Sequence, residues 1–471
     1  MFVSWAAYQL RGRRLDDSMI AGIESEGAMG RDELFEGLPE QRAERSEGAG
    51  APRLRQPQRD QIALRAVDLD SAIGAEHPAR VIWAYCERLD LSALYDAIKA
   101  REGRPGHPPI DPRLMLALWL YATSQGVGSA RALERLCETH DAYRWLCGEV
   151  SVNYHTLADF RVAHPELLDE LLAQHVATLA ASGVIEVATL AQDGLRVRAS
   201  AGAGSFRREK SLRKILKQTR KLVARLKAEL ADDPDASNQR IAAAKQRAAA
   251  EREARVTAAL KKLDELKAER ARRAKTNRKQ TAKQQEPRAS TSDPEARVMK
   301  MADGGFRPAY NMQIACAPEQ QIVVGVDVAT TGSDRGLLRP MLDAVRRRFG
   351  WRVRRHLVDG GFTKNSDIEW AAQQGIAVHC PPTRSKHGSD PFVPRPDDGP
   401  GMAAWRRRMN SPAGKARYKR RPLVECINAR LREWNLRQLT VRGKEKVRSV
   451  LLWGALANNI LQGHRLAQAA A

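Results

Sequence analysis

Short apolar runs with the length and composition of β-strands occur in two separate stretches of the chain, residues 183–204 and 294–380. Between them, residues 205–292 have a different character, because leucine and isoleucine recur at helical spacing against a basic background. We interpret this basic segment as an insertion that interrupts one α/β domain. The domain is then discontinuous, with parts at residues 183–204 and 293–462.

The strand-like runs predict a mixed sheet. A helical segment at residues 337–349 separates the fourth run from the fifth, and strands followed by helices indicate an α/β sheet covered by helices. The predicted strands cover residues 187–191, 195–199, 309–316, 322–328, 352–358 and 376–380.

The insertion at residues 205–292 is predicted to be a helical hairpin. Its first helix carries leucine or isoleucine at positions 212, 215, 222, 226 and 230, and the run 232–235 (D-D-P-D) ends it before a second helix begins. Residues 205–290 contain 26 Lys and Arg against 11 Asp and Glu, so 15 of the 23 net positive charges lie here. Such a run is commonly only a solvated face, but it also suits phosphate contacts, because each neutralised phosphate releases counterions.

Residues 61–182 are predicted to form an all-helical N-terminal domain. Asp111-Pro112 is an N-cap followed by a proline in the first turn, and Ser129 begins a further helix after a glycine-rich turn. Short helices joined by glycine turns suit a helix-turn-helix-like DNA-binding unit. A helical cap that only packs on the next domain is the alternative. Residues 1–58 lack helical and strand periodicity and are expected to be a disordered arm.

The charge of the chain indicates a polyanionic partner. A net charge of +23 and a pI near 10.1 favour nucleic acid. No apolar run reaches the roughly eighteen residues of a membrane span, and the first residues do not form an export signal, so we expect a cytoplasmic protein with no membrane partner. The six cysteines show no zinc spacing, and no phosphate-binding glycine motif predicts a nucleotide cofactor.

Three carboxylates at expected element boundaries, Asp193, Asp359 and Glu425, are the candidate catalytic residues. Asp193 and Asp359 each follow an apolar strand-like run, and Glu425 lies in a helix-like basic stretch. Phosphodiester cleavage with two divalent ions needs oxygen ligands, and Mg²⁺ takes only a few carboxylates beside substrate oxygens and water. The alternative for each aspartate is a turn, because Asp-Gly commonly follows a strand.

The run 359–362 (D-G-G-F) has a second copy at residues 303–306. Asp303 follows a polar segment and precedes a strand, which suits a loop, whereas Asp359 ends an apolar run. Asp327 lies inside a predicted strand, where a solvent-facing position suits it. We therefore place Asp359 in the candidate site and leave Asp303 and Asp327 outside it.

Glu425 belongs to a specific pattern, Y-x2-R-x3-E-x6-[K/R], formed with Tyr418, Arg421 and Arg432. In a helix, residues three, four and seven apart share a face. We expect this face to present a phenol, two cations and a metal-binding carboxylate to DNA. An ordinary amphipathic basic helix gives such a pattern occasionally.

The sequence resembles bacterial insertion-sequence transposases of the DDE class, in the superfamily with a Y-R-E-K signature and a ribonuclease-H-like catalytic core. Within it, the chain is most similar to the group named eleven-eighty-two. The resemblance covers roughly residues 61–204 and 293–460. Its motifs are Asp193-Gly194, the runs 143–148, 153–161 and 293–300, both D-G-G-F runs, and the spacing of Tyr418, Arg421 and Glu425.

The resemblance implies that Asp193, Asp359 and Glu425 bind two Mg²⁺ ions, for which Mn²⁺ can substitute. It implies that Tyr418, Arg421 and Arg432 position DNA. Arg432 departs from the signature, whose last residue is usually lysine, and replaces a compact ammonium by a planar guanidinium.

The resemblance also implies a transposase that binds the ends of a mobile DNA element, cuts DNA strands and joins an exposed 3′-hydroxyl to target DNA. The bacterial cytoplasm, at the nucleoid, is the expected location. A homodimer on DNA is expected, because two ends are processed together. The alternatives are a non-catalytic DNA-binding protein derived from a transposase, and a ribonuclease-H-like nuclease that cuts without joining.

Overall fold

The computed structural model describes residues 68–101, 103, 108–232, 236–276, 286–383 and 390–470, all within one compact unit, Ala66–Ala471. The arm predicted at residues 1–58 lies outside the described residues. No described helix is both long enough and apolar enough to cross a membrane.

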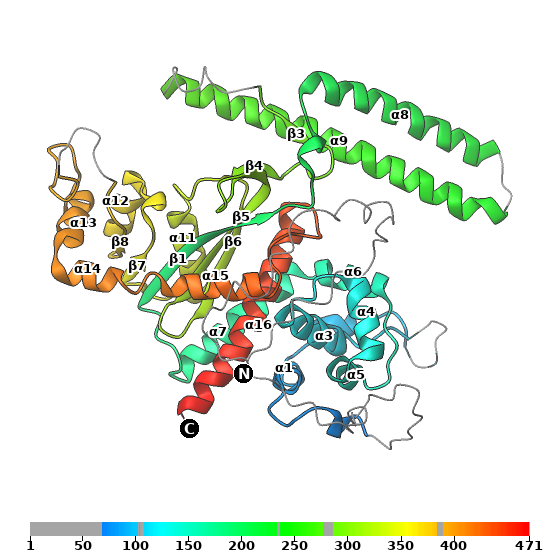
Figure 1. Cartoon of the computed structure of the whole chain (residues 1–471), viewed down its shortest axis with the longest axis horizontal. Helices are drawn as coiled ribbons and strands as arrows, with labels where there is room; N and C mark the ends of the chain where they lie inside the picture. Colours follow the sequence, from blue (N-terminus) through cyan, green and yellow to red (C-terminus); the bar gives the residue numbers. More distant parts are fainter. Residues whose placement is uncertain are drawn as a thin grey trace, which may run out of the picture. The chain divides into compact units, whose positions relative to one another are not determined.

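The described residues before position 182 form helices only, in agreement with the predicted helical N-terminal part (Figure 1). Asp111 and Ser129 are N-caps as predicted, since their side chains accept hydrogen bonds from the backbone N–H of Arg113 and Ala132. The elements are a short 3-10 turn at Asp70–Ala72 and the helices α1 (Pro78–Glu87), α2 (Ser92–Asp96), α3 (Pro112–Ser124), α4 (Ala130–Thr139), α5 (Asp141–Cys147), α6 (Tyr154–Ala163) and α7 (Pro165–Ala181).

Helix α3 is the core of this helical part. Its residues 115–120 are each at most 1% exposed, because α1, α5, α6 and a late helix, α16 (Lys444–Ala470), pack around it. A helix that is apolar all round has to be covered on every side. The indole N–H of Trp119 donates to the carbonyl oxygen of Leu157 on α6 (2.9 Å), which satisfies the one polar atom of that buried side chain.

A mixed sheet forms the second part of the fold. Its strands are β1 (Thr189–Arg198), β4 (Arg297–Lys300), β5 (Phe306–Ala317), β6 (Ile322–Ala329), β7 (Arg355–Leu357) and β8 (Ala377–His379). Their order is β4-β5-β1-β7-β8, and β6 pairs with β5 beside β4. β1 is antiparallel to β5 and parallel to β7, so the sheet is mixed as predicted. This arrangement is consistent with a ribonuclease-H-like core.

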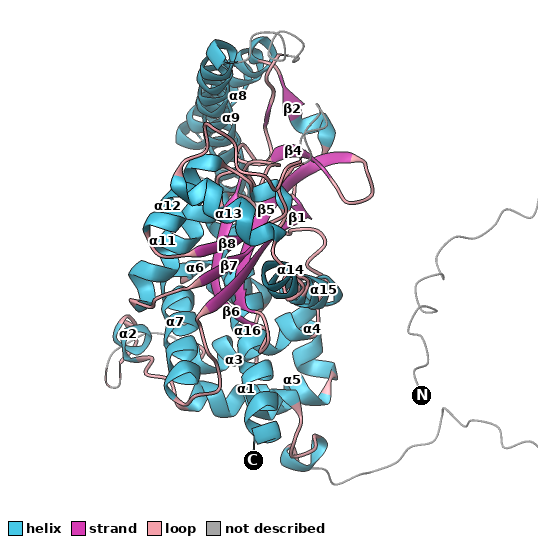
Figure 2. Ribbon diagram, turned by 90° about the vertical axis from the view of Figure 1, so that its left-hand side faces the viewer, coloured by secondary structure: helices cyan, strands magenta, loops and turns pink. Residues whose placement is uncertain are grey.

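Helices cover both faces of the sheet. α11 (Leu338–Phe349), which matches the helix predicted at 337–349, and α15 (Leu423–Glu433) lie on opposite sides in Figure 2. The covered strands are therefore buried, and β5 is buried from Pro308 to its end. The remaining elements are a 3-10 turn at Gly360–Phe362, α12 (Asn365–Gln373), α13 (Pro400–Asn410) and α14 (Pro412–Tyr418).

β1 corrects the sequence prediction. Residues 187–191 and 195–199 were expected to be two strands with Asp193-Gly194 at the boundary, but one strand runs through both residues. Its ladder with β5 is continuous from Ala191 opposite Cys316 to Arg198 opposite Ala309. The strand needs glycine at position 194 because the Asp334 side chain lies close to the backbone there. A Cβ on Gly194 would lie 2.4 Å from Asp334 Oδ1.

Replacing Gly194 by alanine is expected to lower the free energy of unfolding by about 2 kcal/mol. The added methyl carbon would also meet the amide of Gln313 at 2.6 Å, and Asp334 is held in place by hydrogen bonds from Asn311 and Gln313. Urea denaturation measures the change. Gly202→Ala is the matched control, since its added carbon meets nothing within 4 Å. An unchanged midpoint for Gly194→Ala would contradict the expected clash.

The insertion between β1 and β4 is a pair of long helices, α8 (Glu209–Asp232) and α9 (Ala236–Thr276), which pack on each other (Figure 1). A two-stranded sheet, β2 (Phe206–Arg207) with β3 (Ala289–Ser290), joins the two ends of the insertion. The seam has its own small core, separate from that of the sheet: Leu212, Val256, Ala259, Leu263 and Ala289. The segment thus has the helical pairing predicted for it.

Candidate active site

The three candidate carboxylates come from three elements that the fold brings together. Asp193 lies in the middle of β1, and its side chain is 15% exposed. Asp359 follows β7 and caps the 3-10 turn Gly360–Phe362 by accepting from the N–H of Gly361 (2.7 Å). Glu425 lies in the first turn of α15, where more than half of its side chain is exposed.

Arg421 joins these three acids. Its Nη2 lies 2.7 Å from Asp193 Oδ1 and 3.8 Å from Asp359 Oδ2, and its Nη1 pairs with Glu425 Oε1. The guanidinium is only 11% exposed. Carboxylates that are far apart in the sequence are therefore gathered around one buried cation, which offsets their mutual repulsion.

The electrostatic environment of Asp193 is unusual. Burial raises the pKa of its carboxyl to about 6, and the negative charges of Asp359 and Glu425 act in the same direction. The Arg421 guanidinium acts in the opposite direction and lowers the pKa. The Asn428 side-chain amide also donates to Asp193 Oδ2 (2.8 Å). Asp193 is thus a carboxylate that is costly to ionise unless cationic or hydrogen-bonding groups surround it.

The donor set suits a hard divalent cation. As the side chains stand, no group of three acidic, histidine or cysteine residues in the described part of the chain is close enough to share a metal ion. Arg421 has the central position instead. The chemistry nevertheless fits, because all three groups offer the carboxylate oxygens that Mg²⁺ prefers and already surround a positive charge.

The Y-x2-R-x3-E-x6-[K/R] pattern does not lie on one continuous helix. α14 ends at Tyr418 and α15 begins at Leu423, so Arg421 lies in the break between them. Pro422 explains the break, since proline removes an N–H donor and clashes with the preceding helical turn. The expected single helical face is therefore wrong for Tyr418 and Arg421. Burial raises the pKa of the Tyr418 phenol, the charge of Arg421 lowers it, and the charges of Asp359 and Glu425 raise it further.

A cleft of about 650 Å³ opens beside Asp193 and Asp359. β7 pairs only with the first residues of β1, so the rest of that edge of β1 has no neighbouring strand among the described residues. The cleft lies along this unpaired part of the edge. The other end of this edge is closed by a segment after α15, where Leu439 N–H donates to Arg198 O (2.8 Å). The lining combines five arginines with four aspartates: Arg196, Arg198, Arg307, Arg432 and Arg437, and Asp193, Asp303, Asp334 and Asp359. The arginines offer contacts to phosphates beside the carboxylates of the candidate site.

Asn428 and four of the cleft arginines were not anticipated from the sequence. Asn428 lies three residues after Glu425 on α15, so helical spacing could have identified it. The arginines come from β1, β5 and the segment after α15, and no local pattern links them. Arg432 is the only cleft arginine that the motif had predicted.

The competing aspartates have other roles. Asp303 lies in the loop between β4 and β5, where its carboxylate pairs with Arg307 (2.6 Å). Asp303 lines the cleft, but none of the ion pairs of the described residues joins it to Arg421. Asp327 lies on β6 with 44% of its side chain exposed and Lys444 3.8 Å away, as its solvent-facing position predicted.

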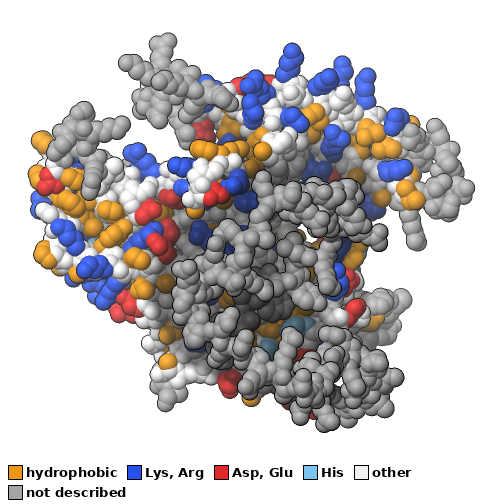
Figure 3. Space-filling model, viewed as in Figure 1, with side chains coloured by type: hydrophobic (Ala, Val, Ile, Leu, Met, Phe, Trp, Pro, Cys, Tyr) orange, Lys and Arg blue, Asp and Glu red, His pale blue; other side chains and the backbone are white. Residues whose placement is uncertain are grey.

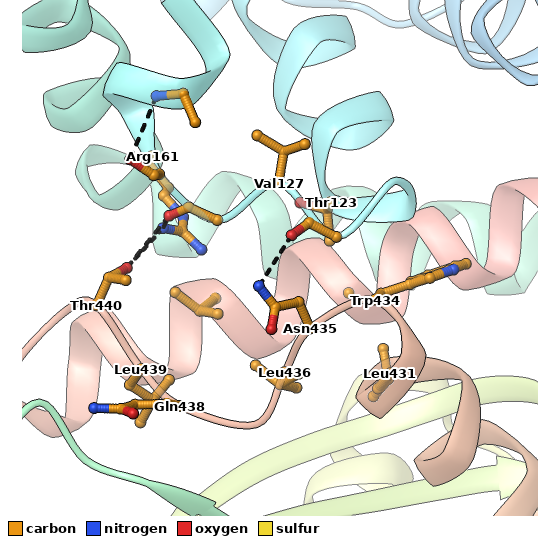
Figure 4. Close-up of a pocket in the computed structure, with 16 residues that line it drawn as sticks. Thr123, Val127, Arg161, Leu431, Trp434, Asn435, Leu436, Gln438, Leu439 and Thr440 are labelled. Atoms are coloured by element: carbon orange, nitrogen blue, oxygen red, sulfur yellow. Dashed lines mark hydrogen bonds between the residues drawn. The ribbon is translucent and has the colours of Figure 1, made fainter. Parts of the chain in front are cut away.

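A second pocket, of about 320 Å³, lies between the helical part and the segment after α15 (Figure 4). Arg161 from α6 crosses it: Nη1 donates to Gly128 O (2.6 Å) and Thr440 Oγ1 (3.1 Å), and the guanidinium lies over the Trp119 ring. No carboxylate lines this pocket. We therefore interpret it as the seam between two parts of the fold, held by Arg161.

Arg161→Met is expected to destabilise the protein by about 1–2 kcal/mol, since it removes the hydrogen bonds that the guanidinium donates to the Gly128 carbonyl and the Thr440 hydroxyl. Thermal denaturation followed by circular dichroism measures the change. Arg131→Met is the control, because Arg131 is exposed, lies over the ring of Tyr154 and does not line this pocket. A melting temperature equal to that of the wild type would contradict a locking role for Arg161.

The chain is an α/β protein whose sheet order is consistent with a ribonuclease-H-like core. Its three candidate carboxylates lie on β1, after β7 and on a later helix. Two family models match the chain: a transposase domain (DUF772) at residues 67–163 and a transposase DDE domain at residues 275–460. The two matches support an insertion-sequence DDE transposase, a class of metal-dependent enzymes. No curated protein and no solved structure matches the chain.

The matched regions leave out part of the site. The DDE match includes Asp359, Arg421 and Glu425 but begins after β1, so Asp193 lies outside both matches. The basic helical pair separates β1 from the rest of the sheet in sequence. Only the pairing of β1 with β5 and β7 brings Asp193 to the other two acids.

Proposed function

We propose that this chain is a transposase of the Y-R-E-K group that binds the ends of a mobile DNA element and carries out metal-dependent strand cleavage and strand transfer. The observation that carries the proposal is the convergence of Asp193, Asp359 and Glu425 on the guanidinium of Arg421, beside a cleft whose lining includes five arginines. Both matched family models are transposase models, which agrees with this chemistry.

Asp193, Asp359 and Glu425 would hold two Mg²⁺ ions, or Mn²⁺ in their place. When bound, such ions activate the attacking oxygen and stabilise the leaving oxygen of a phosphodiester. Asn428 orients Asp193 through its hydrogen bond, and the rigid β1–β5 ladder fixes that carboxylate. Arg421 has to leave the centre of the acids, and its charge is then available to a DNA phosphate nearby.

The remaining cations would hold the DNA. Arg432 lies two turns after Glu425 on α15 and lines the cleft with Asp193 and Asp359. Together with Tyr418 and Arg421, it would position the strand end for in-line attack, and alignment of this kind accounts for much of the catalysis in phosphoryl transfer. Pairing of two element ends favours a homodimer on DNA, at the nucleoid in the bacterial cytoplasm. Helices α1–α7 would contribute to DNA binding as well.

The test incubates the full chain with labelled terminal-repeat DNA, a supercoiled plasmid and Mg²⁺. Joined products support transposition. Cut ends without joined products would indicate a nuclease instead. Bound but intact DNA would indicate a non-catalytic DNA-binding protein. The DNA that flanks the reading frame has to be sequenced first, and a pair of inverted repeats in it would supply the DNA sequence for the assay.

A further inference from the structure

The outer face of α8 is free of packing constraints. The inner face meets α9 through Leu212, Thr219 and Val223, which are buried. The hairpin has its own core at this seam, and β2 and β3 pair at its base. The residue types on the outer face of α8 are therefore not needed to fold the hairpin.

That outer face carries a row of lysines: Lys210, Lys214, Lys217 and Lys221. The intervals of four, three and four residues place them on one side of the helix, opposite the buried seam. All four are exposed, and Arg225 lies one turn further along the same side. Figure 3 shows Lys and Arg side chains projecting from this region, at the top of the view.

The lysine row differs from its neighbours in pairing. Arg213 and Arg220, on the flank of α8, form ion pairs with Glu209 and Glu253. Among the ion pairs of the described residues, none involves a member of the lysine row. A face that served only solubility would mix both signs, whereas this face presents one sign alone.

The dimensions of the row suit duplex DNA. From Lys210 to Lys221 the helix rises by roughly 16 Å, at about 1.5 Å per residue. Duplex DNA carries about one negative charge per 1.7 Å of its axis, so the row can follow several phosphates. The row includes no exposed aromatic or large aliphatic side chain, which a membrane surface would require.

The position of the hairpin connects it to the cleft. β1, which carries Asp193, runs into the base of the hairpin, and the other end of the hairpin returns into β4. Three arginines, Arg270, Arg288 and Arg297, line a hollow at this base, together with Glu269, which pairs with Arg297 (3.9 Å). A duplex whose end enters the cleft can therefore extend towards α8.

We propose that the lysine row of α8 is a second DNA-binding surface, which holds the phosphate backbone of duplex DNA outside the catalytic cleft without reading its sequence. The inference rests on the proposed function for its choice of DNA as partner. Lysine ammonium groups neutralise phosphates but, unlike side chains aimed at base edges, carry no sequence information.

The test variant replaces Lys210, Lys214, Lys217 and Lys221 by glutamine in the full chain. The matched control replaces Arg213, Arg220, Lys262 and Lys267, which are all ion-paired, and so removes the same charge from the same hairpin. Fluorescence anisotropy with a random-sequence DNA duplex gives the Kd at several salt concentrations. Circular dichroism verifies that both variants keep their helices.

The lysine-row variant is expected to bind the duplex at least about tenfold more weakly. Its plot of log affinity against log salt should be shallower by roughly 3–4, since each lost phosphate contact lowers the slope by about 0.9. The control should change much less. Equal losses in both variants, or no loss in the lysine-row variant, would overturn the proposal. Polyglutamate is added as a competitor in the same assay. If it displaces the labelled duplex as well as unlabelled DNA of equal charge does, the lysine row is not selective for DNA and that part of the proposal is overturned.

This binding assay needs neither metal nor catalysis, so it separates the two proposals. A chain that binds through the lysine row but never cuts DNA would refute the catalytic function alone. A chain that cuts and joins DNA normally, with no effect of the lysine-row substitutions on binding, would refute the second surface alone.

Discussion

Asp193→Asn is expected to reduce DNA strand cleavage by roughly 10³-fold or more while leaving DNA binding largely intact. Asparagine keeps the shape of the side chain but removes the negative charge that would hold a divalent cation with Asp359 and Glu425. Such an ion contributes several kcal/mol to the transition state, and each 1.36 kcal/mol is a factor of ten in rate. Product formation from labelled element ends in Mg²⁺ measures the loss.

Asp359→Asn and Glu425→Gln should have the same effect, because the site needs all three carboxylates. Asp303→Asn is the matched control: it lies in the same D-G-G-F sequence and lines the same cleft, but it pairs with Arg307. Near-normal cleavage by any one of the three acid variants would remove that residue from the proposed site. Loss of cleavage in Asp303→Asn would place Asp303, and not only Asp359, in the catalytic site.

The free energy of unfolding of the wild type, minus that of Asp193→Asn, is expected to fall by about 3 kcal/mol as the pH rises from 4 to above 6. Burial raises the pKa of Asp193 in the folded state from 3.8 to about 6. The unfolded chain therefore releases this proton at lower pH than the folded chain, so the penalty on folding grows as the pH rises above the unfolded pKa and is complete above the folded pKa. About two pKa units correspond to about 3 kcal/mol.

The measurement is the free energy of unfolding of both proteins by urea between pH 4 and pH 8, without divalent ions. Asparagine cannot ionise, so the difference between the two curves isolates Asp193 from the other titrating groups. Arg421→Met should move the transition to higher pH, because the guanidinium lowers the pKa of Asp193. If the free energies of unfolding of the wild type and Asp193→Asn change in parallel with pH, folding does not raise the pKa of Asp193.

Added Mg²⁺ should reverse this loss of stability in the wild type and leave Asp193→Asn nearly unchanged. A ligand that binds only the folded state stabilises it according to its concentration relative to Kd. The effect does not depend on catalysis. Thermal denaturation with and without Mg²⁺ at pH 8 measures it, and equal shifts in both proteins would contradict cation binding at Asp193.

Local patterns in the sequence were sufficient for most helices and strands. Asp111 and Ser129 capped helices where predicted, and the strands β5, β6, β7 and β8 fall on predicted apolar runs. These features depend on neighbouring residues, so they can be recognised without knowing the fold. Pro422 is an equally local signal, and it marks the break between α14 and α15 that the spacing of the motif does not reveal.

The sequence by itself determined which chemical groups were available: an acidic set suited to a hard cation, a basic helical insertion, and the periods of helices and strands. The tertiary structure decided how they meet. It made β1 continuous through Gly194, placed Arg421 among the three acids and added Asn428 to the site. The contacts of Asp193 with Arg421 and Asn428 join residues more than two hundred positions apart, and the pairing of β1 with β5 joins residues more than one hundred apart. Such contacts depend on which surfaces pack together, a property that no local period encodes.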